Sequence, residues 1–146
     1  MTQEDKNLLL KDLCGRLPYR VKCKYYDCCE GDYNEGTICG FERQEYIQID
    51  GVCIHIEEVK PYLFPLRSLT SSEAEAIEHI MGCNFPWNIQ YGLLEWTVGG
   101  SVESETFELK IEQIERLIEF LNSHHIDYRG LIPMGSAIDA TNLNIY

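Results

Sequence analysis

The sequence lacks the long apolar run of a membrane protein. No stretch of its 146 residues approaches the roughly 18 consecutive apolar residues that a transmembrane helix needs. Residues 1–6 are polar and acidic, whereas a secretion signal begins with basic residues and continues into an apolar segment. We therefore expect no membrane association and a cytoplasmic location.

Positive charge is also scarce. The 12 Lys and Arg residues are outnumbered by 24 Asp and Glu residues, giving a formal net charge of −12. Direct nucleic-acid binding usually requires a clustered basic surface, and the short basic run of Arg20, Lys22 and Lys24 is too small to offset this charge. We expect no direct nucleic-acid binding. The acidity suits a basic protein partner, mimicry of a polyanion, or simply solubility.

Familiar catalytic and cofactor-binding motifs are missing too. Gly99 and Gly100 are not followed by a lysine and do not join a strand to a helix, so they do not form a phosphate-binding loop. There is no Gly-x-Ser-x-Gly nucleophile motif. The carboxylates between residues 27 and 35 lack the spacing of a calcium loop. We predict no cofactor.

Cysteine, in contrast, is abundant, with seven residues. The odd count, the adjacent pair Cys28-Cys29 and the lack of an export signal favour reduced thiols over disulfides. Cys23, Cys28, Cys29 and Cys39 suggest a zinc site across a hairpin, but their spacing is not that of a zinc knuckle. Buried thiols with one exposed pair in a loop are the preferred interpretation, and we predict no metal.

Length and an apolar share of 45% predict one domain over residues 1–146. The helices and strands predicted along the chain place this domain in the α+β class. Capping-box patterns predict helices that begin at Thr2 and Thr70 and end at Gly15 and Gly82. Alternating apolar residues and an Asp-Gly turn predict a small antiparallel sheet of about four strands, a meander or a partly open barrel, packed with three helices. The four predicted strands cover residues 19–26, 37–41, 45–50 and 52–59.

The third helix is predicted from Phe107, because apolar residues recur at alternate spacings of four and three up to Leu121. This seam can pack within the domain, which we favour, or pair with a second copy in a homodimer. Two further segments are less regular. Residues 60–66 contain two prolines without N–H donors and predict an extended strap across the sheet edge, and residues 91–98 suggest a short strand.

The segment after the third helix has the densest group of reactive side chains: His124, His125, Asp127 and Arg129. They include a possible general base, an orienting carboxylate and an anion-binding guanidinium, which would suit a small hydrolase or transferase. The structural alternative is favoured. Histidines at the end of a helix can bond its last carbonyls, and Asp127 with Arg129 can pin the C-terminal tail as an ion pair. We predict no catalytic residue.

Three stretches resemble a family of uncharacterised small proteins encoded by tailed phages and prophages of gut anaerobic bacteria. They include Leu8-Leu9-Leu10-Lys11-Asp12-Leu13-Cys14, Val59-Lys60-Pro61-Tyr62-Leu63-Phe64-Pro65-Leu66 and Asp127-Tyr128-Arg129-Gly130-Leu131-Ile132. The resemblance covers both ends and the strap, under half of the chain. It implies a phage or mobile-element accessory protein inside a bacterial cell, and it brings no established activity, cofactor or catalytic residue.

The function predicted first is therefore a non-enzymatic protein-binding module that recognises a host or phage protein. Its surface would combine acidic residues with the loops at 27–36 and 84–104, and aromatic residues of the kind enriched in binding hot spots would contribute. The candidate binding residues are Glu30, Asp32, Glu35, Phe85, Trp87 and Trp96. The alternatives are the hydrolase or transferase and a homo-oligomeric structural protein.

Overall fold

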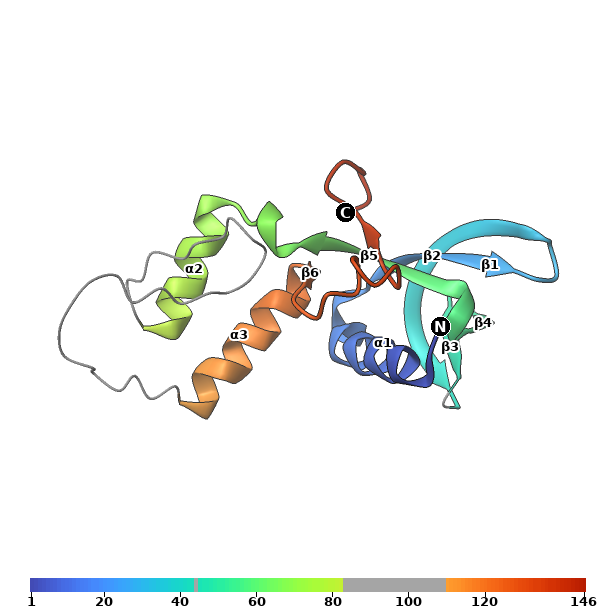
Figure 1. Cartoon of the computed structure of the whole chain (residues 1–146), viewed down its shortest axis with the longest axis horizontal. Helices are drawn as coiled ribbons and strands as arrows, with labels where there is room; N and C mark the ends of the chain where they lie inside the picture. The colour runs from blue at the N-terminus through green and yellow to red at the C-terminus, as the bar shows by residue number, and fades with distance from the viewer. Residues whose placement is uncertain (44, 83–109) are drawn as a thin grey trace.

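The computed structural model describes residues 1–43, 45–82 and 110–146, and these form an α+β fold (Figure 1). Within these ranges, three α-helices accompany a mixed sheet of seven strands. The helices are α1 (Gln3–Arg16), α2 (Ser71–Met81) and α3 (Ile111–Ser123). The strands are β1 (Lys22–Asp27), β2 (Asp32–Glu42), β3 (Tyr46–Ile49), β4 (Val52–His55), β5 (Val59–Pro65), β6 (Ile126–Asp127) and β7 (Ile138–Asp139).

Both predicted capping boxes are present. The Thr2 side chain accepts a hydrogen bond from Asp5 N, and the Asp5 carboxylate accepts one from Thr2 N at 2.9 Å. Thr70 and Glu73 make the same reciprocal pair at the start of α2, and Gly82 ends that helix in a left-handed conformation. The helix α1 extends past the predicted end, to Arg16. Local chemistry therefore decides where these helices begin.

The first four strands form the predicted antiparallel meander, with β2 between β1 and β3 and β4 at the edge. Asp50 and Gly51 form the β3–β4 turn, both with positive φ, as a tight hairpin requires. The strand β2 begins at Asp32, so the β1–β2 turn is shorter than the loop predicted at 27–36. This hairpin extends away from the helices (Figure 1).

The predicted sheet of about four strands is too small, because the proline-containing segment is a strand. β5 pairs antiparallel with β1 on one side and parallel with β6 and β7 beyond it, in the order β4-β3-β2-β1-β5-β6. The prolines are tolerated because no partner follows the whole strand. β1 pairs with residues 59–61, whereas β6 and β7 pair with residues 62–65, so few ladder donors are required.

Two groups of buried apolar side chains form the core. The larger lies between α1 and the sheet and includes Leu9, Leu13 and Ile47, and the smaller joins α2, α3 and β6 around Ile77 and Leu121. The helices α2 and α3 lie side by side at the opposite end of the molecule from the β1–β2 hairpin (Figure 1). The predicted seam of the third helix packs within the chain only at its C-terminal end, because Leu121 is buried whereas Ile111, Ile114 and Ile118 are exposed.

The described residues include no helix long and apolar enough to cross a bilayer. The predicted strand at 91–98, the first residues of the third helix, and Phe85, Trp87 and Trp96 lie outside the described residues.

Candidate functional site

His124, the first of the four reactive residues after α3, caps that helix. Its backbone N–H donates to Phe120 O at 3.1 Å, and its Nδ1 lies 2.9 Å from the same carbonyl oxygen. The imidazole stacks on the Phe120 ring with centroids 4.1 Å apart. An exposed histidine that satisfies the last carbonyls of a helix has the structural role anticipated for this position.

His125, unlike the exposed His124, is buried. Its ring stacks on that of Tyr146, with centroids 4.0 Å apart, and its Nδ1 has no partner among the described residues. Burial first, then the charge of Arg16, lowers the pKa of His125 to about 4, so the imidazole is neutral near pH 7. The backbone of His125 has a positive φ of 56°.

Asp127 and Arg129 do not pair with each other, contrary to the ion pair suggested for them. Both Asp127 carboxylate oxygens accept backbone hydrogen bonds, from Leu131 N at 2.9 Å and Ile132 N at 2.8 Å. Arg129 Nε instead lies 3.2 Å from Asp12 Oδ1 in α1. Asp127 thus fixes the turn that follows it, and Arg129 lies against the ion pair of Asp12 and Arg16 in α1.

The four side chains therefore do not converge on one reaction centre. His124 faces Phe120, His125 faces Tyr146, and both oxygens of Asp127 are already bonded to backbone. A general base needs an accessible proton acceptor within hydrogen-bonding distance of a substrate, and this geometry offers none at Asp127 or His125. Their placement favours the structural interpretation.

The acidic candidates Glu30, Asp32 and Glu35 lie on the β1–β2 hairpin and are exposed. No ion pair in the described part of the chain involves Asp27, Glu30 or Asp32. Between the acidic residues lies Tyr33, whose side chain is 62% exposed. Successive side chains of a strand point to opposite faces, so Tyr33 and Glu35 share one face of β2 and Asp32 lies on the other. The end of this hairpin therefore carries exposed carboxylates together with an exposed aromatic ring.

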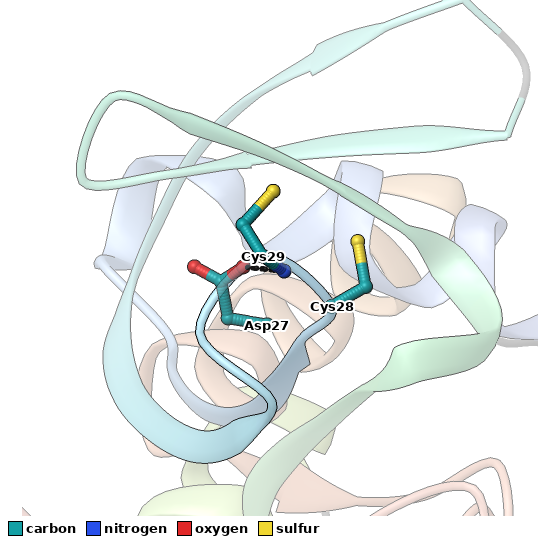
Figure 2. Close-up of side chains that lie close together, drawn as sticks. All are labelled: Asp27, Cys28 and Cys29. Atoms are coloured by element: carbon teal, nitrogen blue, oxygen red, sulfur yellow. Dashed lines mark hydrogen bonds between the residues drawn. The ribbon is translucent and has the colours of Figure 1, made fainter.

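The cysteines fall into separate environments. Cys23 is buried and its thiol donates to Gly36 O, while Cys39 is exposed and contacts Gln48 O. Cys28 and Cys29 are exposed in the β1–β2 turn beside Asp27 (Figure 2). The structure therefore separates the four thiols of the zinc hypothesis and leaves an adjacent pair with a carboxylate.

A cavity of about 230 Å³ lies between the hairpin, β5 and the C-terminal tail. Several of its polar groups already have partners. Tyr62 OH donates to Glu35 Oε1 at 2.6 Å, and Lys22 Nζ donates to Ile145 O at 2.6 Å. None of His124, His125, Asp127 and Arg129 lines it. These hydrogen bonds make the cavity an anchoring point for the C-terminal tail.

The sequence analysis did not single out two features of this surface and core. One is Tyr33, because nothing in its neighbours distinguishes an exposed tyrosine from a buried one. The other is the fully buried pair Asp12 and Arg16, because the first helix was predicted to end at Gly15, before Arg16. Their spacing of four residues was the available signal, since such pairs face each other on a helix.

Comparison with models of known protein families, with curated proteins and with solved structures finds no match.

Proposed function

We propose that this chain is a non-enzymatic protein-binding module, a phage or mobile-element accessory protein that binds a host or phage protein in the cytoplasm of a bacterial host. The observation that carries the binding role is Tyr33, which is exposed at the end of a hairpin that also carries the exposed carboxylates of Glu30 and Asp32. The phage origin rests on the sequence resemblance alone.

Tyr33 is exposed yet held in place. Its ring meets Tyr26 edge-on, with centroids 5.2 Å apart, and Lys24 Nζ lies 5.1 Å from the ring centroid on the same hairpin. A fixed aromatic ring loses little conformational entropy when it enters a partner's pocket. Tyrosine is also one of the residue types enriched in binding hot spots.

The exposed carboxylates at the same end of the hairpin indicate the chemistry of the partner. Glu30 and Asp32 are exposed, and neither forms an ion pair within the described ranges. Unpaired surface carboxylates attract a basic patch and raise its association rate, in a way that added salt weakens. The partner surface would thus be a basic rim around a pocket that accepts one aromatic ring.

The test is capture of a partner from bacterial lysate by the whole chain, followed by affinity measurement with the purified partner. We expect Tyr33→Ala to weaken binding by at least about tenfold, as truncation of a hot-spot residue does. The double variant Glu30→Lys/Asp32→Lys should slow association and remove most of its salt dependence.

Matched controls make the same kinds of substitution on other surfaces of the chain. Tyr46→Ala removes an aromatic that is 41% exposed on β3, and Glu58→Lys/Glu75→Lys makes the same charge change elsewhere. Binding should survive both. Equal binding by wild type and the hairpin variants, or equal loss in the controls, would disprove the hairpin as the interface.

A homo-oligomer is the second candidate, and α3 is the observation in its favour. Ile111, Ile114 and Ile118 lie on one side of the helix and are 75, 41 and 38% exposed. An antiparallel pair of α3 helices would bury these side chains and place Lys110 of one copy near Glu119 of the other. Sedimentation velocity over a range of concentrations tests this candidate, and Ile114→Glu should abolish any dimer that is observed.

A further inference from the structure

We propose that Asp27, Cys28 and Cys29 form a binding site for a thiophilic divalent cation of the zinc class, at the β1–β2 turn. This inference is independent of the protein-binding role, because it concerns three ligand atoms on one turn and does not involve Tyr33.

Geometry provides the first support. One ligand atom from each of the three residues lies within 4.8 Å of the others. Figure 2 shows both sulfur atoms directed to the same side of the turn, with the Asp27 carboxylate beside Cys29. Two thiolates on one tetrahedral zinc ion are separated by about 3.8 Å, as Zn–S bonds of about 2.3 Å require. The separation of the ligand atoms is therefore already close to what one bound ion requires.

The turn also holds the carboxylate in place. Asp27 Oδ1 accepts a hydrogen bond from Cys29 N at 2.8 Å, which leaves Oδ2 free to bind a cation. Gly31 N donates to Asp27 O at 2.7 Å and closes the turn. Because these bonds exist before any ion binds, little ordering of the backbone is needed on binding.

The chemistry of the ligands selects the class of ion. Thiolates are soft ligands that prefer zinc and related metals to magnesium or calcium, and two thiolates with a carboxylate make three ligands. The thiols of Cys28 and Cys29 are exposed, so the fourth position opens to solvent and a water molecule would fill it.

The electrostatic environment favours a cation as well. The Asp27 carboxylate lies beside both thiols, and neither Asp27 nor the exposed Glu30 and Asp32 of the same hairpin forms an ion pair in the described part of the chain. A divalent cation would offset this negative charge. Binding converts two thiols to thiolates and therefore releases two protons for each ion bound.

Titration of the reduced whole chain with Cd²⁺ alone tests the site, because thiolate-to-cadmium charge transfer absorbs in the ultraviolet and its intensity reports the number of thiolates bound. We expect one Cd²⁺ ion to bind per chain, with two thiolates as ligands. Addition of Zn²⁺ should displace the Cd²⁺, and binding should release about two protons near pH 7. Cys28→Ser and Cys29→Ser should each weaken binding by at least about tenfold. Asp27→Asn should weaken it less and keep the two-thiolate band.

Two further exposed thiols provide the matched controls. Cys39 lies on β2 and Cys53 on β4, and the Cys53 thiol donates to Glu42 Oε2 at 2.8 Å. Cys39→Ser and Cys53→Ser should bind Cd²⁺ like the wild type. Circular dichroism of every variant confirms the fold, which substitution of exposed turn residues should preserve. Unchanged binding in Cys28→Ser/Cys29→Ser, or its loss in Cys39→Ser or Cys53→Ser, would overturn the proposal.

Discussion

The Asp12 carboxylate holds the Arg16 guanidinium in a bidentate ion pair, with Nε 2.6 Å from Oδ2 and Nη2 3.0 Å from Oδ1, and both side chains are fully buried. Arg16 also donates to Ile126 O at 2.7 Å, so one side chain of α1 bonds the chain that follows α3. The Tyr128 ring lies 5.3 Å from the guanidinium carbon. This pair therefore links the two groups of buried apolar side chains.

Asp12→Asn should strongly destabilise the fold. Removal of one partner of a buried ion pair leaves an uncompensated buried charge, here that of Arg16, and costs about 3 to 5 kcal/mol in the free energy of unfolding. Urea denaturation followed by circular dichroism measures this loss. As a control, Lys6→Ala removes the ion pair with Glu57 at the surface and should change stability far less. Equal effects of the two substitutions would contradict a structural role for the buried pair.

The stability of the protein should fall as the pH is lowered from about 6.5 to about 4, in part through His125. The folded state lowers the pKa of this imidazole to about 4, so below 6.5 the unfolded chain binds a proton that the folded chain does not. The contribution is present above 6.5 and is lost on acidification, by at most on the order of 3 kcal/mol.

The variant His125→Phe isolates this effect, because a phenyl ring keeps the stacking on Tyr146 and does not titrate. Its stability should depend less steeply on pH over that interval than the wild type's, whatever its starting value. The exposed residue His79 supplies the control, and His79→Gln should retain the wild-type slope. Identical slopes for wild type and His125→Phe would show that His125 does not contribute.

Gly36→Ala should be costly, because the strand passes too close to its neighbour for a methyl group. A Cβ at Gly36 would lie 2.5 Å from Ile49 Cγ2 and 2.7 Å from Asp50 Oδ2, and Ile49 is fully buried. Overpacking of this kind costs about 1 to 3 kcal/mol. At Gly40 the nearest atom is the end of the flexible Gln48 side chain. Thermal unfolding should therefore show a clearly larger drop in Tm for Gly36→Ala than for Gly40→Ala, and the reverse order would refute the crowding.

Tyr146→Phe should loosen the C-terminal tail. The Tyr146 hydroxyl donates to Tyr62 O at 2.9 Å and accepts from Lys22 N at 3.1 Å, and its loss leaves both groups to find other partners, at a cost of about 1 kcal/mol. Hydrogen exchange at the Lys22 amide should accelerate. Tyr33→Phe is the matched control, since no hydrogen bond of the Tyr33 hydroxyl is seen in the described ranges. Unchanged exchange at Lys22 would contradict the anchoring role.

Features determined by neighbouring residues were predictable. Thr2 with Asp5 and Thr70 with Glu73 fix helix starts because each cap satisfies backbone donors within one turn. Asp50 and Gly51 fix the β3–β4 hairpin for the same reason, since a tight turn demands positive φ at two consecutive residues. In each case the interaction is complete within a few residues of sequence.

Features that depend on distant parts of the chain could not be predicted from the sequence. The prolines at 61 and 65 argued against a strand, yet β5 joins β1 to the short strands β6 and β7, which come from residues more than 60 positions later. Arg16 is buried because carbonyls 105 and 110 residues away accept its hydrogen bonds. No local pattern reveals such partners.

The sequence by itself determined the acidic character, the helix caps and the adjacency of Asp27, Cys28 and Cys29, because these follow from covalent order and local backbone chemistry. Only the tertiary structure decided which of those groups are available. It buried His125 and Arg16, bonded Asp127 to backbone, and left Tyr33 and the paired thiols exposed at the end of the β1–β2 hairpin. The physical reason is desolvation, because the packing of distant elements determines which polar groups lose water and must find a partner within the protein.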